Sequence, residues 1–345
     1  MDALVRSALN QLVLREDLDQ GLVQQVFGLL MDGACQDIEI AALLTGLAVK
    51  GETEAEIAGA AQAMRARASR IPTARTGLLD TCGTGGDHLS TFNISTATAI
   101  VVAACGVPVA KHGNRKASSS SGSADVLEAL GVNIELSANQ AGTCLDEIGI
   151  CFCYARLMHG AMKHVAPVRT ALGIRTIFNF LGPLTNPAQA QFQLLGANRI
   201  ASAEKLAGAA RRLGIPRVFV VCGNDELDEV ALWGETTVIE VTGQKLNRQT
   251  WGPADFGLPA CTAADLHVDS PARSAEVIQG IISGQPGPAR NIVVANAAAA
   301  LLCAGHASDL KSGVAHVQQA LDSGTVAQKL EDLIRVSHRL SSVEP

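Results

Sequence analysis

The sequence contains nine cysteines but no Cys-X-X-Cys pair, and the closest two, Cys151 and Cys153, lie in an apolar run. Structural zinc sites need ligand pairs at short spacing, and disulfide frameworks use even sets of cysteines. We therefore predict reduced, mostly buried thiols in a cytoplasmic protein, with no structural metal bound through sulfur.

An excess of basic residues and a membrane-spanning apolar run are also missing. The net charge of −6 and the pI near 5.8 argue against a broad basic face for nucleic acid, but leave room for a local cationic pocket. Residues 1–6 show no secretory signal, and the uncharged residues 89–110 carry Ser, Thr, Asn, Gly and Pro throughout. We expect a small-molecule partner, no nucleic acid and no membrane.

From residue 3 to about 70, apolar residues recur at the spacing of helix faces, for example at Leu22, Val26 and Leu30. These faces exceed what a short helical core needs. We predict an N-terminal helical domain, residues 1–72, joined by a helical segment near residues 165–190. It packs on the rest of the chain and supplies a homodimer interface.

After residue 72, apolar runs at 107–110, 152–155, 192–196 and 217–222 alternate with helical stretches. This alternation is typical of α/β domains with a largely parallel sheet. We predict such a catalytic domain over residues 73–345, with a hairpin near Gly243 at the sheet edge.

A glycine-rich segment, Gly-Thr-Gly-Gly-Asp at residues 83–87, follows the apolar Leu78 and Leu79. Glycines at the carboxyl end of a strand let several backbone N–H groups approach an anion. The segment is neither a Walker A loop nor a dinucleotide fingerprint. A simple tight turn is the alternative interpretation.

Two more donor-rich segments follow. Asn-Ile-Ser-Thr at residues 93–96 opens an apolar helix, either as a cap or as a phosphate site at the positive end of the helix. Lys-His-Gly-Asn-Arg at residues 111–115 follows an apolar strand, where its cations suit a phosphorylated ligand or form a solvated turn. The serine run at 118–123 favours a binding loop over a flexible linker.

An acidic segment, residues 223–229, places four carboxylates within five residues after another apolar strand. Such carboxylates repel one another unless water or a metal ion neutralises them. The segment is therefore a magnesium site or a solvated turn. Elsewhere in the chain, Arg169 stands out because a guanidinium pairs bidentately with a carboxylate, whereas His159 and His164 are each more typical of satisfied core histidines.

Taken together and in this order, these segments resemble the anthranilate phosphoribosyltransferase family. The resemblance covers nearly the whole chain and includes Ser-Gly-Ser-Ala-Asp at 121–125 and the run at 175–187. It implies a small helical domain, a larger α/β domain related to the pyrimidine nucleoside phosphorylases, and a homodimer. It also implies transfer of phosphoribose from phosphoribosyl pyrophosphate (PRPP) to the amino group of anthranilate, the second step of tryptophan biosynthesis from chorismate. Pyrophosphate is released, with two Mg²⁺ ions per subunit.

The resemblance also implies site residues. Ser95, Asp228 and Glu229 would hold Mg²⁺, while Gly83, Asn114 and Arg169 would face anthranilate, and Lys111 would stabilise the departing pyrophosphate. No general base is assigned, because an aromatic amine needs little deprotonation before it attacks. The residues around PRPP would be Gly83, Gly86, Asp87, Thr91, Asn93, Ile94, Ser95, Thr96, Lys111, His112, Gly113, Asn114, Arg115, Lys116, Ala117, Ser118, Ser119 and Ser123.

Three positions depart from the common family pattern: Arg156, Gly160 and Glu226. Glu226 adds a carboxylate beside the metal pair, and Arg156 affects the expected shape of the anthranilate channel. Two other functions compete with the transferase. A nucleoside phosphorylase would carry Lys-His and Gly-Gly in one loop, but here they lie in different loops. A DNA-binding paralogue conflicts with the acidic pI and the retained metal carboxylates.

Overall fold

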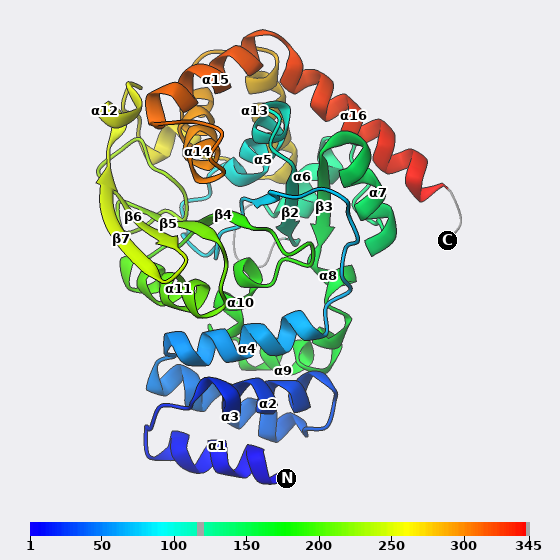
Figure 1. Cartoon of the computed structure of the whole chain (residues 1–345), viewed down its shortest axis with the longest axis vertical. Helices are drawn as coiled ribbons and strands as arrows, with labels where there is room; N and C mark the ends of the chain where they lie inside the picture. The colour runs from blue at the N-terminus through cyan, green and yellow to red at the C-terminus, as the bar shows by residue number, and fades with distance from the viewer. Residues whose placement is uncertain (116–120, 343–345) are drawn as a thin grey trace.

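The computed structural model describes residues 1–115 and 121–342. Its first four helices form a layer at one end of the molecule, below the sheet in Figure 1. They are α1 (Ala3–Val13), α2 (Gln20–Met31), α3 (Asp37–Lys50) and α4 (Glu54–Ala66). Asp19 caps α2 by accepting a hydrogen bond from the Leu22 amide, and Thr53 and Glu56 form a capping box on α4.

Seven strands form one sheet in the order β3-β2-β1-β4-β5-β6-β7. The first five are parallel, and the last two form an antiparallel hairpin at the edge, as predicted. The strands are β1 (Leu79–Asp80), β2 (Val109–Gly113), β3 (Ile150–Tyr154), β4 (Phe192–Gly196), β5 (Arg217–Gly223), β6 (Thr236–Thr242) and β7 (Lys245–Trp251). The predicted fold class, a small helical domain plus a mostly parallel α/β domain, is confirmed.

The sheet separates two hydrophobic cores, because successive side chains of a strand point to opposite faces. On β5, Phe219 and Val221 pack into one core, whereas Val218 and Val220 pack into the other. The first core is covered by α5 (Ile94–Ala104), α6 (Ser123–Ala129), α7 (Ala138–Ile148), α12 (Pro253–Phe256), α13 (Pro271–Ile282), α14 (Pro288–Cys303), α15 (Leu310–Asp322) and α16 (Thr325–Ser341), with a 3-10 turn at Ala263–Leu266.

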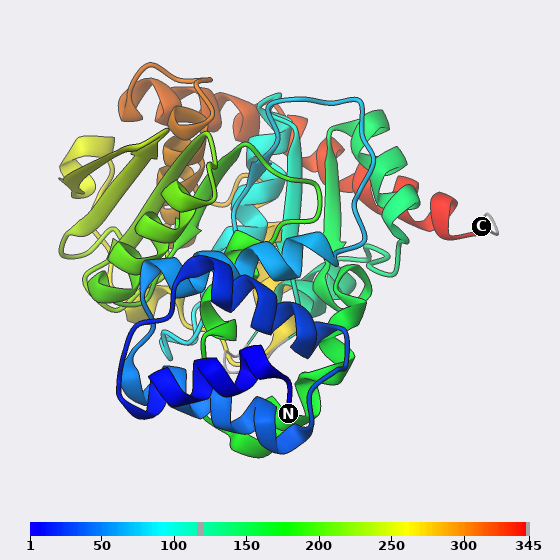
Figure 2. The ribbon, with the colours of Figure 1, turned by 60° about the horizontal axis from the view of Figure 1, so that its bottom comes forward.

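The second core joins the N-terminal helices to the other face of the sheet. Val165, Phe178 and Leu181 are buried in this core together with residues of α1–α4. Figure 2 shows this junction after a turn of the molecule, with the N-terminal helices in front. The connecting elements are α8 (Ala155–Met158), a 3-10 turn at Gly160–His164, α9 (Ala166–Leu172), α10 (Phe178–Leu184) and α11 (Ile200–Arg212).

The second strand differs from its predicted position. It begins at Val109 and continues through Lys111, His112 and Gly113, so the cationic segment starts inside the strand rather than after it. Burial of these polar groups is possible because each has a partner: Lys111 Nζ donates to Thr81 O, and the His112 amide donates to Asp80 Oδ1. In the described ranges, no helix has the length and apolar character needed to cross a bilayer.

Candidate active site

A cavity of about 770 Å³ lies at the carboxyl ends of the central strands, beside α8, α9 and α10. The sheet order reverses at β1, since β2 and β3 lie on one side of it and β4 to β7 on the other. Ligands of open α/β sheets bind at such a reversal, outside the carboxyl ends of the strands. The volume suits a small molecule and its co-substrate.

The glycine-rich loop after β1 meets the acidic loop after β5 in this cavity. The Gly85 amide donates to Asp228 Oδ2 at 2.6 Å, and the Thr84 amide donates to Gly196 O at 2.9 Å. A Cβ atom on Gly83 would overlap the Asp228 carboxylate, and one on Gly196 would overlap the Asp228 carbonyl oxygen. The acidic loop therefore crosses over the end of β4, and only glycine at these positions leaves room for it.

The amino end of α5 also faces the cavity. Asn93 caps this helix: its Oδ1 atom accepts from the Thr96 amide at 3.0 Å and from the Ser95 hydroxyl at 3.2 Å. Nδ2 of the Asn93 side chain donates to Ser121 O, which ties the cap to the segment just before α6. The capping interpretation is thus correct for Asn93, and the cap holds the Ser95 hydroxyl close to Lys111.

Among the described residues, the charged side chains of the cavity are not paired with one another in ion pairs at short distance. Lys111 Nζ donates to Thr81 O at 2.9 Å and to Ser95 Oγ at 3.2 Å, and no carboxylate of the described chain lies within 4 Å of it. Burial, followed by repulsion from Asp87, raises the pKa of Asp228 to about 7, and burial also raises the pKa of Asp87. Burial and the Asp228 charge raise the pKa of Glu229 well above its usual range. Asp87, Asp228 and Glu229 therefore resist ionisation in the absence of a bound cation, and such a cluster of hard oxygen ligands is suited to binding a divalent cation.

A tighter group of potential ligands, Asp80, Cys82 and His112, has ligand atoms within 4.8 Å of one another. Both Asp80 oxygens are already used, because Oδ1 accepts from the His112 backbone amide and Oδ2 accepts from the Asn186 side-chain Nδ2 at 2.7 Å. His112 Nδ1 donates to Gly182 O at 2.9 Å. This group therefore holds β1, β2 and the segment after α10 together, and we assign it no metal.

Two imidazoles, those of His112 and His159, form a hydrogen-bonded pair in the cavity wall. Since His112 Nδ1 faces a carbonyl oxygen and carries the proton, its Nε2 atom accepts from His159 Nε2 at 3.2 Å. Burial lowers the pKa of His112 to about 3 and that of His159 to about 4. Both rings are neutral at pH 7, and the pair positions the wall formed by α8 and α10.

Arg169 on α9 offers the cavity a cation of a different kind. Its guanidinium lies 4.9 Å from the centre of the Phe178 ring, and burial lowers its pKa. Among residues 1–115 and 121–342, no carboxylate forms an ion pair with it. A half-buried guanidinium without an internal partner is suited to a ligand carboxylate.

Comparison with known proteins identifies the family. The α/β domain of the glycosyl transferase family matches residues 75–327, and the helical bundle domain of that family matches residues 6–68. The anthranilate phosphoribosyltransferase of Desulforudis audaxviator is 47% identical over 341 residues, covering 99% of each chain. This chain belongs to the anthranilate phosphoribosyltransferase family.

Solved structures of the family agree with this fold. The anthranilate phosphoribosyltransferase of Thermus thermophilus has a TM-score of 0.90 and 40% identity, covering 96% of this chain and 99% of that chain. The Saccharomyces cerevisiae protein, solved in complex with PRPP and Mg, has a TM-score of 0.90 and 25% identity, covering 98% and 99%. The predicted family and the predicted transferase class are confirmed.

Most of the predicted family site residues line the one cavity. Thr96 does not: its side chain is fully buried beside a smaller void, and only its amide takes part in the cap. Lys116, Ala117, Ser118 and Ser119 lie outside the described residues. Those that line the cavity are Gly83, Gly86, Asp87, Thr91, Asn93, Ile94, Ser95, Lys111, His112, Gly113, Asn114, Arg115, Ser123, Arg169, Asp228 and Glu229.

Sequence reasoning assigned no role to several other residues of the cavity wall. Among them are His159, Phe178, Asn179 and Met64, the last contributed by the N-terminal helices. The histidine and the run around Phe178 were noticed as segments, but an isolated histidine or phenylalanine is more often part of a core. Met64 sits in a helical apolar pattern and gives no separate signal.

The three departures from the family pattern have different positions. Arg156 and Gly160 line the cavity, so they shape its wall. Glu226 does not line it, because its Oε1 atom accepts hydrogen bonds from Trp233 Nε1 at 2.8 Å and from Asn224 Nδ2 at 2.9 Å. Burial is the main reason that the pKa of Asp87 is raised, and the Glu226 charge adds to the same shift. Its effect on the acid cluster is therefore electrostatic and indirect.

Proposed function

We propose that this cavity transfers the phosphoribosyl group of PRPP to the amino group of anthranilate, giving N-(5-phosphoribosyl)anthranilate and pyrophosphate. Family membership confirms the predicted function and enzyme class, and with them a place in tryptophan biosynthesis. The deciding structural observation is the pairing of two recognition chemistries in one cavity. The cavity is lined both by a glycine, lysine and carboxylate cluster and by Arg169, which has no ion-pair partner among the described residues.

The donor side stabilises charge that develops on the leaving group. As the bond from the anomeric carbon to pyrophosphate breaks, negative charge gathers on the pyrophosphate oxygens. Lys111 and the amide of Gly86 are positioned to interact with that charge more strongly in the transition state than in the ground state. The positive end of α5 adds to the same field. Ser123 and Thr91 complete the donor site in this proposal.

The residues that would hold magnesium are Ser95, Asp228 and Glu229. Their fit is supported by the raised pKa values of the two carboxylates, for which burial and mutual repulsion outweigh the charge of Lys111. When bound, Mg²⁺ neutralises pyrophosphate charge. We propose two ions per subunit, because Asp87 adds a third carboxylate to the cavity beside Asp228.

The acceptor side orients anthranilate. In this proposal Arg169 pairs with the anthranilate carboxylate while Asn114 and Gly83 lie near the attacking amine. The aromatic amine is nucleophilic in its neutral form, so correct placement next to the anomeric carbon supplies most of the rate gain. His112 and His159 remain neutral and keep the wall between α8 and α10 in place.

The direct test follows anthranilate fluorescence after PRPP and Mg²⁺ are added to the purified chain. We expect the fluorescence to fall and one pyrophosphate to appear for each anthranilate consumed. A parallel reaction with inorganic phosphate and a pyrimidine nucleoside serves as the control for the phosphorylase alternative. Turnover of the nucleoside with unchanged anthranilate fluorescence would overturn the proposal.

Magnesium affinity should rise between pH 6 and pH 8. The pKa of Asp228 is raised from 3.8 to about 7, so below pH 7 the cation must displace a proton, and above it the carboxylate is free. The affinity should change by up to about tenfold per pH unit for each proton displaced. The same raised pKa makes the metal-free protein lose stability as the pH rises from about 4 to about 7, with no further loss from this group above that. Titration calorimetry at three pH values tests this, and a pH-independent affinity would contradict it.

We infer that the chain forms a cytoplasmic homodimer through its N-terminal helical domain, residues 1–72. Support comes from exposed apolar side chains on and beside α1 and α3, namely Val13, Leu14, Ile38 and Val49. Replacing Ile38 and Val49 with glutamate should convert the dimer to a monomer in light scattering after size exclusion. A dimer that survives both changes would contradict this interface.

A further inference from the structure

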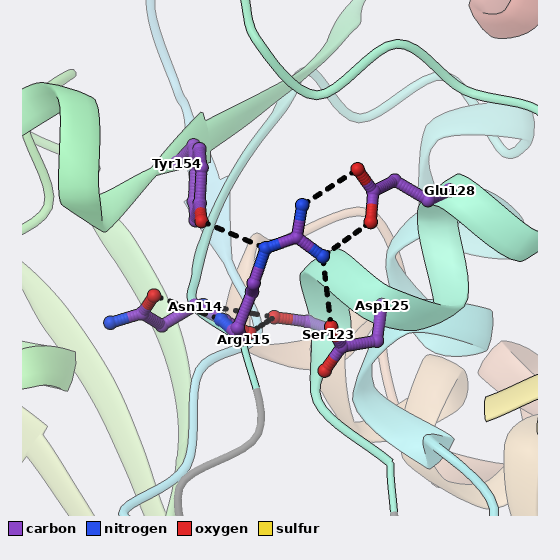
Figure 3. Close-up of polar contacts among 6 residues, drawn as sticks. All are labelled: Asn114, Arg115, Ser123, Asp125, Glu128 and Tyr154. Carbon is purple, nitrogen blue, oxygen red and sulfur yellow. Dashed lines mark hydrogen bonds and ion pairs between the residues drawn. The ribbon is translucent and has the colours of Figure 1, made fainter. Parts of the chain in front are cut away.

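The side chain of Arg115 lies in a polar cluster with Tyr154, Asp125 and Glu128 (Figure 3). Its Nε atom donates to the Tyr154 hydroxyl at 3.1 Å, and Nη1 donates to Asp125 Oδ1 at 3.0 Å. Glu128 receives a two-pronged contact, from Nη2 at 2.7 Å and from Nη1. Arg115 therefore links the end of β3 to α6.

Arg115 follows Asn114, which is hydrogen-bonded to Ser123, and both of these residues belong to the proposed substrate site. The Asn114 amide donates to Ser123 Oγ at 3.1 Å, and the Asn114 carbonyl accepts from the Ala124 amide at 3.2 Å. The Arg115 amide in turn donates to Asn114 Oδ1 at 2.8 Å. Figure 3 shows the Asn114 amide group pointing away from the guanidinium. Fixing Arg115 thus fixes the direction in which Asn114 points.

The guanidinium has little capacity left for a phosphate. Arginine has five N–H donors, and the contacts to Tyr154, Asp125 and Glu128 engage four of them. A two-pronged phosphate contact would have to break a bidentate carboxylate pair, which is the geometry that arginine binds best. The side chain is 40% exposed, so water screens the pair and limits what it adds to global stability. The role that these contacts leave for Arg115 is to position the residues next to it.

We propose that Arg115 is a positioning residue: clamped by Glu128, Asp125 and Tyr154, it orients Asn114 and Ser123 toward the substrates and does not itself bind the donor phosphates. This proposal rests on the proposed function, since it assigns a role within that reaction. It also makes Glu128 and Tyr154, neither of which lines the cavity, part of the support of the site.

The sign of a Glu128→Gln effect separates this role from direct phosphate binding. If Arg115 bound the donor, removing the competing Glu128 charge would free the guanidinium and tighten the binding of an anion. If Arg115 positions Asn114, the same change loosens the clamp. We expect Arg115→Met and Glu128→Gln each to lower kcat/KM for both substrates by roughly three- to tenfold, with effects that are not additive in the double variant.

A charge swap supplies the second readout. Arg115→Glu combined with Glu128→Arg restores the pair with its ends exchanged and should recover most of the activity lost in Arg115→Glu alone. Arg248→Met with Glu204→Gln, an exposed ion pair between β7 and α11, is the matched control and should leave the rate unchanged. Far-UV circular dichroism and thermal unfolding check that every variant is folded.

Calorimetric binding of inorganic pyrophosphate with Mg²⁺ completes the experiment. The proposal is overturned if Glu128→Gln binds pyrophosphate more tightly than the wild type, or if the swap shows no recovery. A wild-type chain that fails to consume anthranilate would refute the proposed function instead. In that case, pyrophosphate binding by Glu128→Gln still distinguishes the two roles of Arg115: tighter binding indicates a phosphate contact, and weaker binding indicates a positioning residue.

Discussion

Replacing Asp228 with Asn and Glu229 with Gln in one variant should abolish the magnesium dependence of the reaction and lower kcat/KM for PRPP by about a thousandfold. The reason is that metal ions supply several kcal/mol of transition-state charge stabilisation, and a tenfold rate change corresponds to about 1.4 kcal/mol. An asparagine side chain would still accept a hydrogen bond at the position where Asp228 accepts from Gly85. The glycine loop should therefore keep its shape.

The variant should not unfold more easily than the metal-free wild type. Burial raises the pKa of both carboxylates, so neutral replacements remove a charge that the fold disfavours. Asp225→Asn with Glu226→Gln is the matched control, because it removes two charges from the same loop at positions outside the cavity. Steady-state rates across a magnesium titration make the comparison. A double variant that keeps wild-type magnesium dependence would exclude this metal site.

Replacing Arg169 with alanine should raise the KM for anthranilate by roughly ten- to a hundredfold and leave the KM for PRPP within about twofold. A hydrogen bond to a charged group contributes about 1.5–3 kcal/mol, and Arg169 has no ion-pair partner in the described chain that could share its charge. Arg169→Lys keeps the charge but loses the planar fork, so an intermediate KM is expected.

Steady-state kinetics with each substrate varied in turn would measure this split. The loss of the stacking contact on Phe178 is a separate consequence of the alanine change, and Phe178→Leu controls for it. Benzoate-type inhibitors provide a further readout, because their carboxylate should lose affinity in parallel with anthranilate. Equal rises in both KM values would show that Arg169 shapes the cavity as a whole and does not recognise a carboxylate.

The parts of the fold that follow from local patterns were predictable from sequence. The run at residues 192–196 became β4 with the same bounds, because a short apolar run buried on both faces has few alternatives. The position of Lys111 was less predictable, since polar residues after an apolar run usually mark a loop. Its carbonyl partner Thr81 lies 30 residues away, and only the packed sheet brings the two together.

The candidate site shows the same contrast. The glycine and acidic segments could be placed at strand ends from the apolar runs before them, and the structure gathers them in one cavity with the cationic segment, which begins inside β2. The pairing of His112 with His159 could not be foreseen, because it depends on the alignment of β2 with β3 over 47 residues of separation. The partners of Arg115 were equally hidden, since a basic turn gives no sign that carboxylates 10 and 13 residues later will hold it.

The crossing of the acidic loop above Gly196 ties the chemistry to the completion of the fold. Asp228 reaches the Gly85 amide only if β4 and β5 are aligned beneath it. A compact folding intermediate whose central strands are misaligned would therefore contain helices but would lack the PRPP-binding pocket. Titration with pyrophosphate and Mg²⁺ then measures the fraction of molecules with a correctly aligned sheet, whereas a measurement of helix content does not.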